Sequence, residues 1–378
     1  MRLLIVHPGA DWSVSDLFDG YAAAFRTLGH DVGVYNLSAR IEVAHGWLHY
    51  CWRKAGRAET RPGPVETIYR ASLDVVNAAL IGDVDWVFVI SGMYLHPDAL
   101  IMLRRAGRRV ALLLTESPYE DDRQIRVARL ADVVFTNERT SVQGLRAVNP
   151  NVYYLPHAYD PRKHRPTAET DDDVPAHDVV FVGTGFQERL DILGAVDWAG
   201  IDLGLYGTYE LMGSRSKLRQ FVRGKVVSNE FAAALYRRAK IGLNLYRQSV
   251  HYHRDSPRIT TAESVNPRAL ELAACGVFTI SDYRPEVEEV FGGLVPTFTT
   301  PQQLQKLLSF WLADETGRQT LASGLPGRVA RSAFYHRAKS ISDLLMGDSA
   351  SIIGYDDRTG AAPAGAHRTT REACLAAV

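Results

Sequence analysis

Short apolar runs alternate with amphipathic stretches along the first half of the chain. Apolar runs bounded by turn residues are typical of strands, whereas apolar positions spaced three and four apart are typical of helices. We expect strands at 3–7, 32–35, 86–90, 110–114, 133–136 and 152–155, with helices at 15–28, 65–80, 97–106, 122–130 and 141–148. This alternation indicates βαβ units and a parallel sheet wound on both faces.

A second series of the same kind follows in the other half. We expect strands at 179–182, 203–206, 241–245, 277–280 and 294–297, with helices at 186–197, 216–221, 230–239 and 268–274, and two or more helices within 301–345. The predicted fold class is therefore α/β, with two Rossmann-like, doubly wound domains facing across a cleft. In such sheets ligands bind at the carboxyl ends of the strands.

The pattern also divides the chain. An N-terminal domain is expected over 1–158 and a C-terminal one over 177–325. The segment 159–176 is interpreted as a linker, because it holds several prolines and an acidic run with almost no apolar periodicity. A further helix is expected at 326–346. In 347–378 small residues and Pro replace the core pattern, which predicts a mobile tail.

Composition narrows the function classes. The 378 residues are 46% hydrophobic and carry no net charge, which counts against non-specific binding to nucleic acid or to an anionic membrane. The three cysteines lack the CxxC spacing that marks zinc sites and suggest no disulfide framework. The N-terminus is interpreted as a first strand, not a signal peptide, and no apolar run reaches the ~20 residues needed to span a bilayer. We expect a soluble, cytoplasmic protein.

The segment from Glu263 to Gly276 holds the most informative pattern. Pro267 favours a helix that begins there, which places Glu263 and Asn266 in a loop, and Arg268 and Glu271 on the first helical turns. Backbone N–H groups and a guanidinium can hold phosphate, and a carboxylate can hold ribose hydroxyls. The segment therefore predicts a nucleotide-diphosphate site.

Further candidates for this site follow the neighbouring strands. Strand 179–182 opens into a glycine-containing turn before a helix, strand 203–206 ends in another glycine, and a polar Asn lies inside strand 241–245. Glycine lets a backbone approach a ligand closely, although a tight turn or a buried hydrogen bond would explain the same residues. The candidates are Gly183, Thr184, Gly185, Arg189, Tyr206, Gly207 and Asn244.

Two acidic residues follow strands in the first half. Asp11 could act as general base on an acceptor hydroxyl, or cap the next helix. Glu116 follows another strand and is a second candidate base. The aromatic-rich segment His45–Trp52 could line an acceptor cleft, or form a core or flap helix. No metal site is expected, since the pair His251 and His253 has no partner cluster in the sequence.

With these motifs placed, the chain resembles the GT-B glycosyltransferases, especially the CgeB-like branch named after a spore-maturation protein. The resemblance is strongest over 178–290 and looser in the first half. The spacing of Glu263 and Glu271 is similar to the E-x7-E pattern of retaining GT-B enzymes. The Gly-rich stretch that usually follows the first Glu is replaced here by residues 264–268.

The resemblance implies a glycosyltransferase with a nucleotide-sugar donor in the C-terminal half and an acceptor entering from the N-terminal half. It implies that Glu271 holds the ribose and that Glu263 lies near the donor sugar. Arg189 and Arg268 would stabilise the leaving diphosphate without a bound metal or other cofactor. UDP is the default nucleotide, and retention is favoured over inversion. The segment 159–176 would act as a hinge, and helices after Pro301 would pack back on the first domain.

Two other functions fit the same motifs: a nucleotide-sugar epimerase or hydrolase, and a non-catalytic nucleotide-sugar-binding or assembly protein. The acceptor stays open. A protein, a glycan or a small molecule is favoured over DNA because the chain lacks a concentrated basic face. The absence of an obvious membrane-binding helix counts against a lipid.

Overall fold

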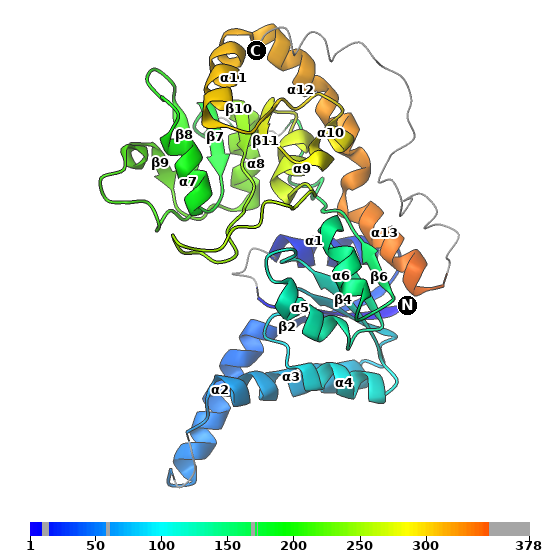
Figure 1. Ribbon diagram of the computed structural model, residues 1–378. Coiled ribbons are helices and arrows are strands. Elements are labelled where there is room, and N and C mark those ends of the chain that lie inside the picture. The colour runs from blue at the N-terminus through cyan, green and yellow to red at the C-terminus, as the bar shows by residue number, and fades with distance from the viewer. Residues whose placement is uncertain (10–14, 58–60, 168–170, 172, 348–378) are drawn as a thin grey trace. The chain divides into compact units, whose positions relative to one another are not determined.

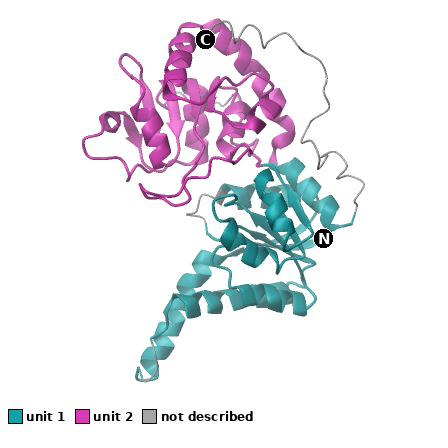
Figure 2. Cartoon of the chain, viewed as in Figure 1, with its two compact units in different colours: residues 1–156, 334–351 teal, residues 157–333, 352–378 magenta. Residues whose placement is uncertain are grey.

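The computed structural model describes residues 1–9, 15–57, 61–167, 171 and 173–347. The chain forms two compact units (Figure 2). Among the described residues, unit 1 comprises the chain up to Pro156 together with 334–347, and unit 2 comprises 157–333. The division thus falls two residues before the expected end of the first domain, at 158. The predicted tail lies outside the described residues, apart from Gly347.

A six-stranded parallel sheet forms the centre of unit 1, in the order β2-β1-β3-β4-β5-β6 (Figure 1). Each expected strand of the first half is present, and Leu3 of the first lies opposite Trp86 of the third. The strands are β1 (Arg2–His7), β2 (Asp31–Asn36), β3 (Trp86–Ile90), β4 (Arg109–Leu114), β5 (Val133–Thr136) and β6 (Val152–Tyr154).

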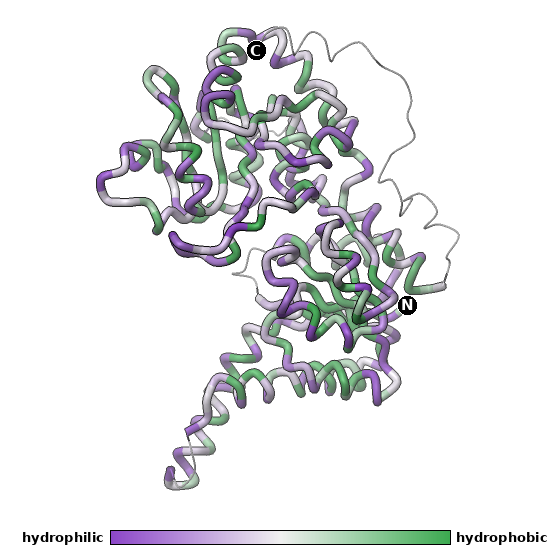
Figure 3. The backbone as a smooth tube through the Cα atoms, viewed as in Figure 1, coloured by the Kyte–Doolittle hydropathy of each residue, from purple (hydrophilic) through white to green (hydrophobic). Residues whose placement is uncertain are grey.

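Helices cover both faces of this sheet because its strands are apolar on both sides. Leu4 and Val6 of β1 belong to a core cluster that includes residues of α3 and α4, and Figure 3 shows hydrophobic residues recurring along α3. The helices are α1 (Ser15–Thr27), α2 (Leu37–Lys54), α3 (Pro64–Ile81), α4 (Pro97–Arg105), α5 (Asp121–Ala128), α6 (Val142–Arg146), the 3-10 turn η1 (Arg139–Ser141) and α13 (Phe334–Leu345). Of these, α2 is longer than the helical segment His45–Trp52 considered from the sequence.

The helix α13 belongs to unit 1 although it follows unit 2 in the chain. It packs against α1. The ring of Phe334 lies edge-on to the ring of Tyr21, with 5.0 Å between centroids, and a Cβ at Gly20 would overlap it. The single helix expected over 326–346 is two elements, since α12 ends at Val329 before α13 begins.

Unit 2 has its own six-stranded parallel sheet, in the order β12-β11-β10-β7-β8-β9. The strands β7 and β10 are neighbours at the centre of this sheet. From β7 the chain proceeds to one edge of the sheet and from β10 to the other, so the strand order reverses between them, as in dinucleotide-binding sheets. The strands are β7 (His177–Val182), β8 (Leu203–Tyr206), β9 (Val222–Gly224), β10 (Ala239–Asn244), β11 (Thr279–Asp282) and β12 (Thr297–Phe298). The strand β9 is not among those expected from the sequence.

The helices of unit 2 follow the expected order with one addition, α10. They are α7 (Gln187–Gly194), the 3-10 turn η2 (Lys217–Phe221), α8 (Asn229–Arg238), α9 (Pro267–Ala274), α10 (Pro285–Phe291), α11 (Pro301–Ala313), α12 (Glu315–Val329) and the 3-10 turn η3 (Ala330–Ser332). No helix in the described part of the chain is long and apolar enough to cross a bilayer.

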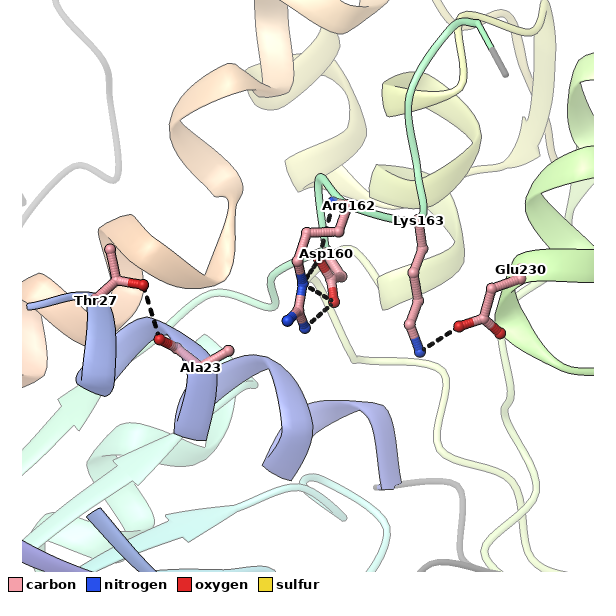
Figure 4. Close-up of polar contacts among 6 residues, drawn as sticks. All are labelled: Ala23, Thr27, Asp160, Arg162, Lys163 and Glu230. Carbon is pink, nitrogen blue, oxygen red and sulfur yellow. Dashed lines mark hydrogen bonds and ion pairs between the residues drawn. The ribbon is translucent and has the colours of Figure 1, made fainter. Parts of the chain in front are cut away.

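The described residues of the expected linker, 159–176, belong to unit 2. The Asp160 carboxylate accepts hydrogen bonds from Arg162, one of them at 2.6 Å, and Lys163 pairs with Glu230 of α8 at 3.0 Å (Figure 4). Asp171 accepts two hydrogen bonds from Arg237 of the same helix. These contacts fasten the segment to unit 2, because each ion pair joins it to itself or to α8. Its action as a hinge stays a prediction.

Candidate functional site

The candidate donor site lies at the carboxyl edge of the unit 2 sheet, where β7 and β10 reverse the strand order. The side chain of Arg268 crosses this point. Its Nε donates to the carbonyl of Val182 at 2.5 Å and its Nη1 to the carbonyl of Leu245 at 3.2 Å. Its guanidinium also lies over the ring of Phe181, 4.8 Å from the centroid. One cation thus joins the ends of the two central strands.

Arg268 forms no salt bridge with an acidic side chain among the described residues, although its charge acts on the buried carboxyl of Asp282. Carbonyls and an aromatic face hold the side chain in place but leave its net charge intact. An uncompensated cation in a half-buried position attracts an anionic ligand more strongly than a solvated one does. This is the position in which a nucleotide diphosphate would meet the sheet.

The helix α9 begins as the sequence predicts. Asn266 is its N-cap, with Oδ1 accepting from the backbone N–H of Ala269 at 3.0 Å, and Pro267 follows as the first helical residue. The Asn266 side chain thus makes a capping bond, and its contact with a ligand stays a prediction. The cap fixes the direction in which the following residues leave the helix.

Glu271 lies one turn further along α9. It is half-buried, and in the part of the chain that the structure describes its carboxylate makes no hydrogen bond or ion pair. Buried or half-buried carboxylates are usually paired, so this one is available to a ligand. Glu263 lies in the loop before the cap, also half-buried, and its carbonyl accepts from the N–H of Glu286.

The glycines at the strand ends make room for other parts of unit 2. A Cβ at Gly183 would overlap the Arg268 guanidinium, and Gly207, with φ at +134°, lies against the backbone of Gly183. A Cβ at Gly185 would likewise overlap the ring of Tyr209. These glycines allow close packing within unit 2, and their contact with a ligand stays a prediction.

Two more predicted residues, Tyr206 and Asn244, make hydrogen bonds within unit 2. The ring of Tyr206 is buried in the core, and its hydroxyl is hydrogen-bonded to Nε2 of His177 at 2.9 Å. Asn244 is fully buried and donates to Ser281 Oγ at 3.0 Å. Side chains alternate across a strand, and these two point into the layers beside the sheet instead of beyond its edge.

Arg189 lies near the start of α7 as expected, but its side chain is buried. Its Nη1 donates to the carbonyl of Thr184 at 2.9 Å, and the guanidinium lies between the rings of Phe181 and Phe186. Arg189 and Arg268 therefore both contact the ring of Phe181. Thr184 contributes its carbonyl to this arrangement, and its side chain is half-exposed.

Sequence reasoning missed the segment after β11, which holds the Glu263 loop in place. Arg284 Nη1 donates to the carbonyl of Ser264 at 2.7 Å, and Glu286 Oε2 accepts from the N–H of Val265 at 2.5 Å. Both side chains are buried. The signal that could have identified these residues is a charged segment directly after a buried strand.

Asp282, at the end of β11, is the other residue that was missed. Its carboxyl is buried and accepts two bonds from the N–H of Tyr246, at 2.9 and 3.0 Å. Burial raises the pKa of Asp282 to about 7, and the positive charges of Arg284, Arg189 and Arg268 lower it by less than burial raises it. The carboxyl is thus an ionisable group beside the candidate donor site.

In unit 1, Glu116 lies after β4 and is half-buried, while Asp11 lies outside the described residues. The aromatic segment on α2 divides between two sides of the helix. His49 is buried against the fold, whereas Trp47 and Tyr50 are 55% and 47% exposed. Part of the segment is therefore buried and part exposed, and its role in an acceptor cleft stays a prediction.

Comparison with known proteins gives the following matches. Residues 186–343 match the family described as glycosyl transferase-like. The spore protein CgeB of Bacillus subtilis (strain 168) is 25% identical over 205 residues, a match that covers 52% of this chain and 63% of that protein. The chain therefore matches less than two thirds of the length of this relative.

Solved structures match over more of the chain. Anabaena HepE in complex with UDP-glucose gives a TM-score of 0.60 at 15% identity, covering 92% of this chain and 99% of that one. A UDP-forming α,α-trehalose-phosphate synthase from Burkholderia vietnamiensis gives 0.60 at 12% identity, covering 93% and 98%. At these identities the likeness is one of fold. The predicted fold class and the family resemblance stated from the motifs are both confirmed.

Proposed function

We propose that this chain, a CgeB-like glycosyltransferase of the GT-B fold, transfers a sugar from a nucleotide-diphosphate sugar to an acceptor. The observation that carries the proposal is that Arg268 and Glu271 both lie on the first turns of α9. Arg268 crosses the point where the strand order reverses. The carboxylate of Glu271 makes no hydrogen bond or salt bridge among the described residues. A cation and a carboxylate one turn apart suit the diphosphate and the ribose of one nucleotide.

The proposed nucleotide is UDP. HepE is in complex with UDP-glucose, and the Burkholderia synthase is named as UDP-forming. Arg268 would bind the diphosphate, and Arg189, which contacts the same Phe181 ring, would add to the positive potential. Cations already positioned in a half-buried site stabilise a leaving diphosphate without reorganising during the reaction. We therefore propose a reaction that needs no bound metal, tested by retained activity in a chelator.

Retention of configuration is proposed from the spacing of Glu263 and Glu271. Glu263 lies in a loop fixed by Arg284 and Glu286, which would hold it beside the donor sugar. Proton NMR of the product reads the anomeric configuration directly. An inverted product would transfer the catalytic role to a base in unit 1, where Asp11 and Glu116 are the candidates.

The first experiment measures nucleotide binding by thermal shift with UDP, GDP, ADP, CMP and dTDP. A ligand at about 100 times its Kd adds roughly 2.7 kcal/mol to the free energy of unfolding, which gives a clear shift. We expect UDP to stabilise the protein and Glu271→Ala to weaken UDP binding by about tenfold or more, because a charged hydrogen bond to the ribose contributes roughly 1.5–3 kcal/mol.

The matched control is Glu288→Ala, which removes an exposed carboxylate from the neighbouring helix α10. This variant should bind UDP as the unmodified chain does. Unchanged affinity in Glu271→Ala would remove the ribose assignment. UDP binding without transfer to any acceptor would instead favour a non-catalytic binding protein.

A further inference from the structure

A cavity of about 670 Å³ opens in unit 1 beside α2 and the start of α3. Its volume falls within the range of small-molecule sites, roughly 300–1,000 Å³. The described residues that line it come from unit 1 alone, so its existence does not depend on unit 2. None of the residues predicted from the sequence as catalytic or donor-binding lines it.

The cavity lies where a ligand is expected in a doubly wound sheet. In unit 1 the strand order β2-β1-β3 reverses at β1. Pro8 directly follows β1 and Tyr94 follows β3, and both line the cavity. Ligands of such sheets bind in the crevice outside the carboxyl ends of the strands at this reversal.

One side of α2 forms a wall of the cavity. Ile41, His45 and His49 are spaced four residues apart and therefore lie along one side of the helix. The rings of the two histidines are 4.2 Å apart. Burial lowers the pKa of His49, and the charges of His45, Arg61 and Arg53 lower it further.

Most of the exposed wall is carbon. Ile41, Ile68 and three prolines contribute apolar surface, and the hydroxyl of Thr67 is already donated to the carbonyl of Gly63 at 2.9 Å. The charged lining residues, Glu42 and Arg61, are exposed and can keep their charges in water. A sugar would lose its hydrogen bonds to water against such a wall, at a cost of about 1–3 kcal/mol for each unpaired hydroxyl.

We propose that this cavity binds the acceptor, and that the acceptor is a small molecule whose hydroxyl is carried on an apolar ring skeleton. This inference rests on the proposed function, because it names the substrate that receives the sugar. Burial of the skeleton against the carbon wall supplies the affinity, at roughly 25 cal/mol for each Å² of apolar surface removed from water. The polar groups at the cavity would then orient the hydroxyl.

The test measures saturable binding of three probes, 4-methylumbelliferone, 1-naphthol and borneol, and of glucose as a hydrophilic comparison. In Ile68→Trp and in His45→Trp an indole enters the cavity from two different helices. The control Val65→Trp places the same side chain on α3 at a position that is 65% exposed and does not line the cavity. UDP affinity is measured in the same samples and reports on unit 2.

We expect at least one apolar probe to bind, glucose not to bind, and both cavity variants to weaken the probe by tenfold or more, with Val65→Trp unchanged. With UDP-glucose present, the bound probe should also become glycosylated. Equal probe binding in all the variants, or saturable binding of glucose alone, would overturn the inference while leaving UDP binding intact. Absence of UDP binding in the unmodified chain would count against the proposed function instead, since the probe titration reads unit 1 separately.

Discussion

At the scale of single residues, Asp282 links the stability of unit 2 to pH. An aspartate ionises near 3.8 in the unfolded chain, whereas burial raises the pKa of Asp282 to about 7 in the fold. Between these values the folded chain holds a proton that the unfolded chain lacks. The contribution of this group to the free energy of unfolding is therefore full below about pH 4 and is lost as the pH rises through 7.

Asp282→Asn should remove this loss, because an amide stays neutral at every pH. We expect the free energy of unfolding of the variant, relative to the unmodified chain, to increase by up to roughly 4 kcal/mol between about pH 4 and pH 8, from 1.36 kcal/mol per unit of pKa. Urea denaturation over this range measures it. The exposed Asp255→Asn serves as control, and parallel pH profiles for Asp282→Asn and the unmodified chain would contradict the expectation.

At the scale of elements, α9 combines a local start signal with the candidate donor site. Asn266 caps the helix and Pro267 begins it, and these two residues determine where Arg268 and Glu271 leave the backbone. Ser228 caps α8 in the same way, with Oγ accepting from the N–H of Phe231 at 3.2 Å. The two caps therefore offer a matched comparison between a helix in the site and one outside it.

Loss of either cap should lower the free energy of unfolding by about 1 kcal/mol, the usual cost of replacing an N-cap by Ala. Only Asn266→Ala should also weaken UDP binding, because it frees the first turn that carries Arg268. Chemical denaturation and UDP titration of both variants check this. Equal UDP affinity in Asn266→Ala and Ser228→Ala would show that the cap has no part in donor binding.

At the scale of the whole molecule, the chain leaves unit 1 after Pro156 and returns to it at Phe334. The returning helix α13 completes one layer of unit 1, with Phe334 packed against Tyr21 and Gly20 of α1. Unit 1 is thus formed from both ends of the described chain. Its stability depends on residues that are synthesised after the whole of unit 2.

Phe334→Ala should lower the stability of unit 1 by about 3–5 kcal/mol, because it leaves a cavity where the ring is buried. Chemical unfolding is followed with saturating UDP, which should stabilise unit 2. The unfolding transition of unit 1 should then shift to lower denaturant, while the affinity for UDP stays unchanged. Tyr335→Ala, at the next and 42% exposed position, should have little effect. Similar losses in the two variants would mean that α13 does not stabilise unit 1 through this ring.

The glycines and Tyr206 show where prediction from the sequence stops. Glycine at 183, 185 and 207 predicts close approach to a ligand, whereas the groups beside these positions in the structure are Arg268, Tyr209 and the backbone of Gly183. Tyr206 was placed at the strand end, yet its hydroxyl bonds to His177 in the core. Partners this far away along the chain leave no local pattern.

The sequence by itself determined the order of strands and helices apart from β9 and α10, the two doubly wound sheets and the start of α9. It did so because apolar periodicity and capping residues act over a few neighbouring positions. Tertiary structure alone decided that Arg268 crosses β7 and β10, that Asp282 is buried, and that α2 and α3 enclose a cavity with a carbon wall. Each of these arises when segments distant in sequence pack together. Burial and charge then depend on neighbours that no local pattern specifies.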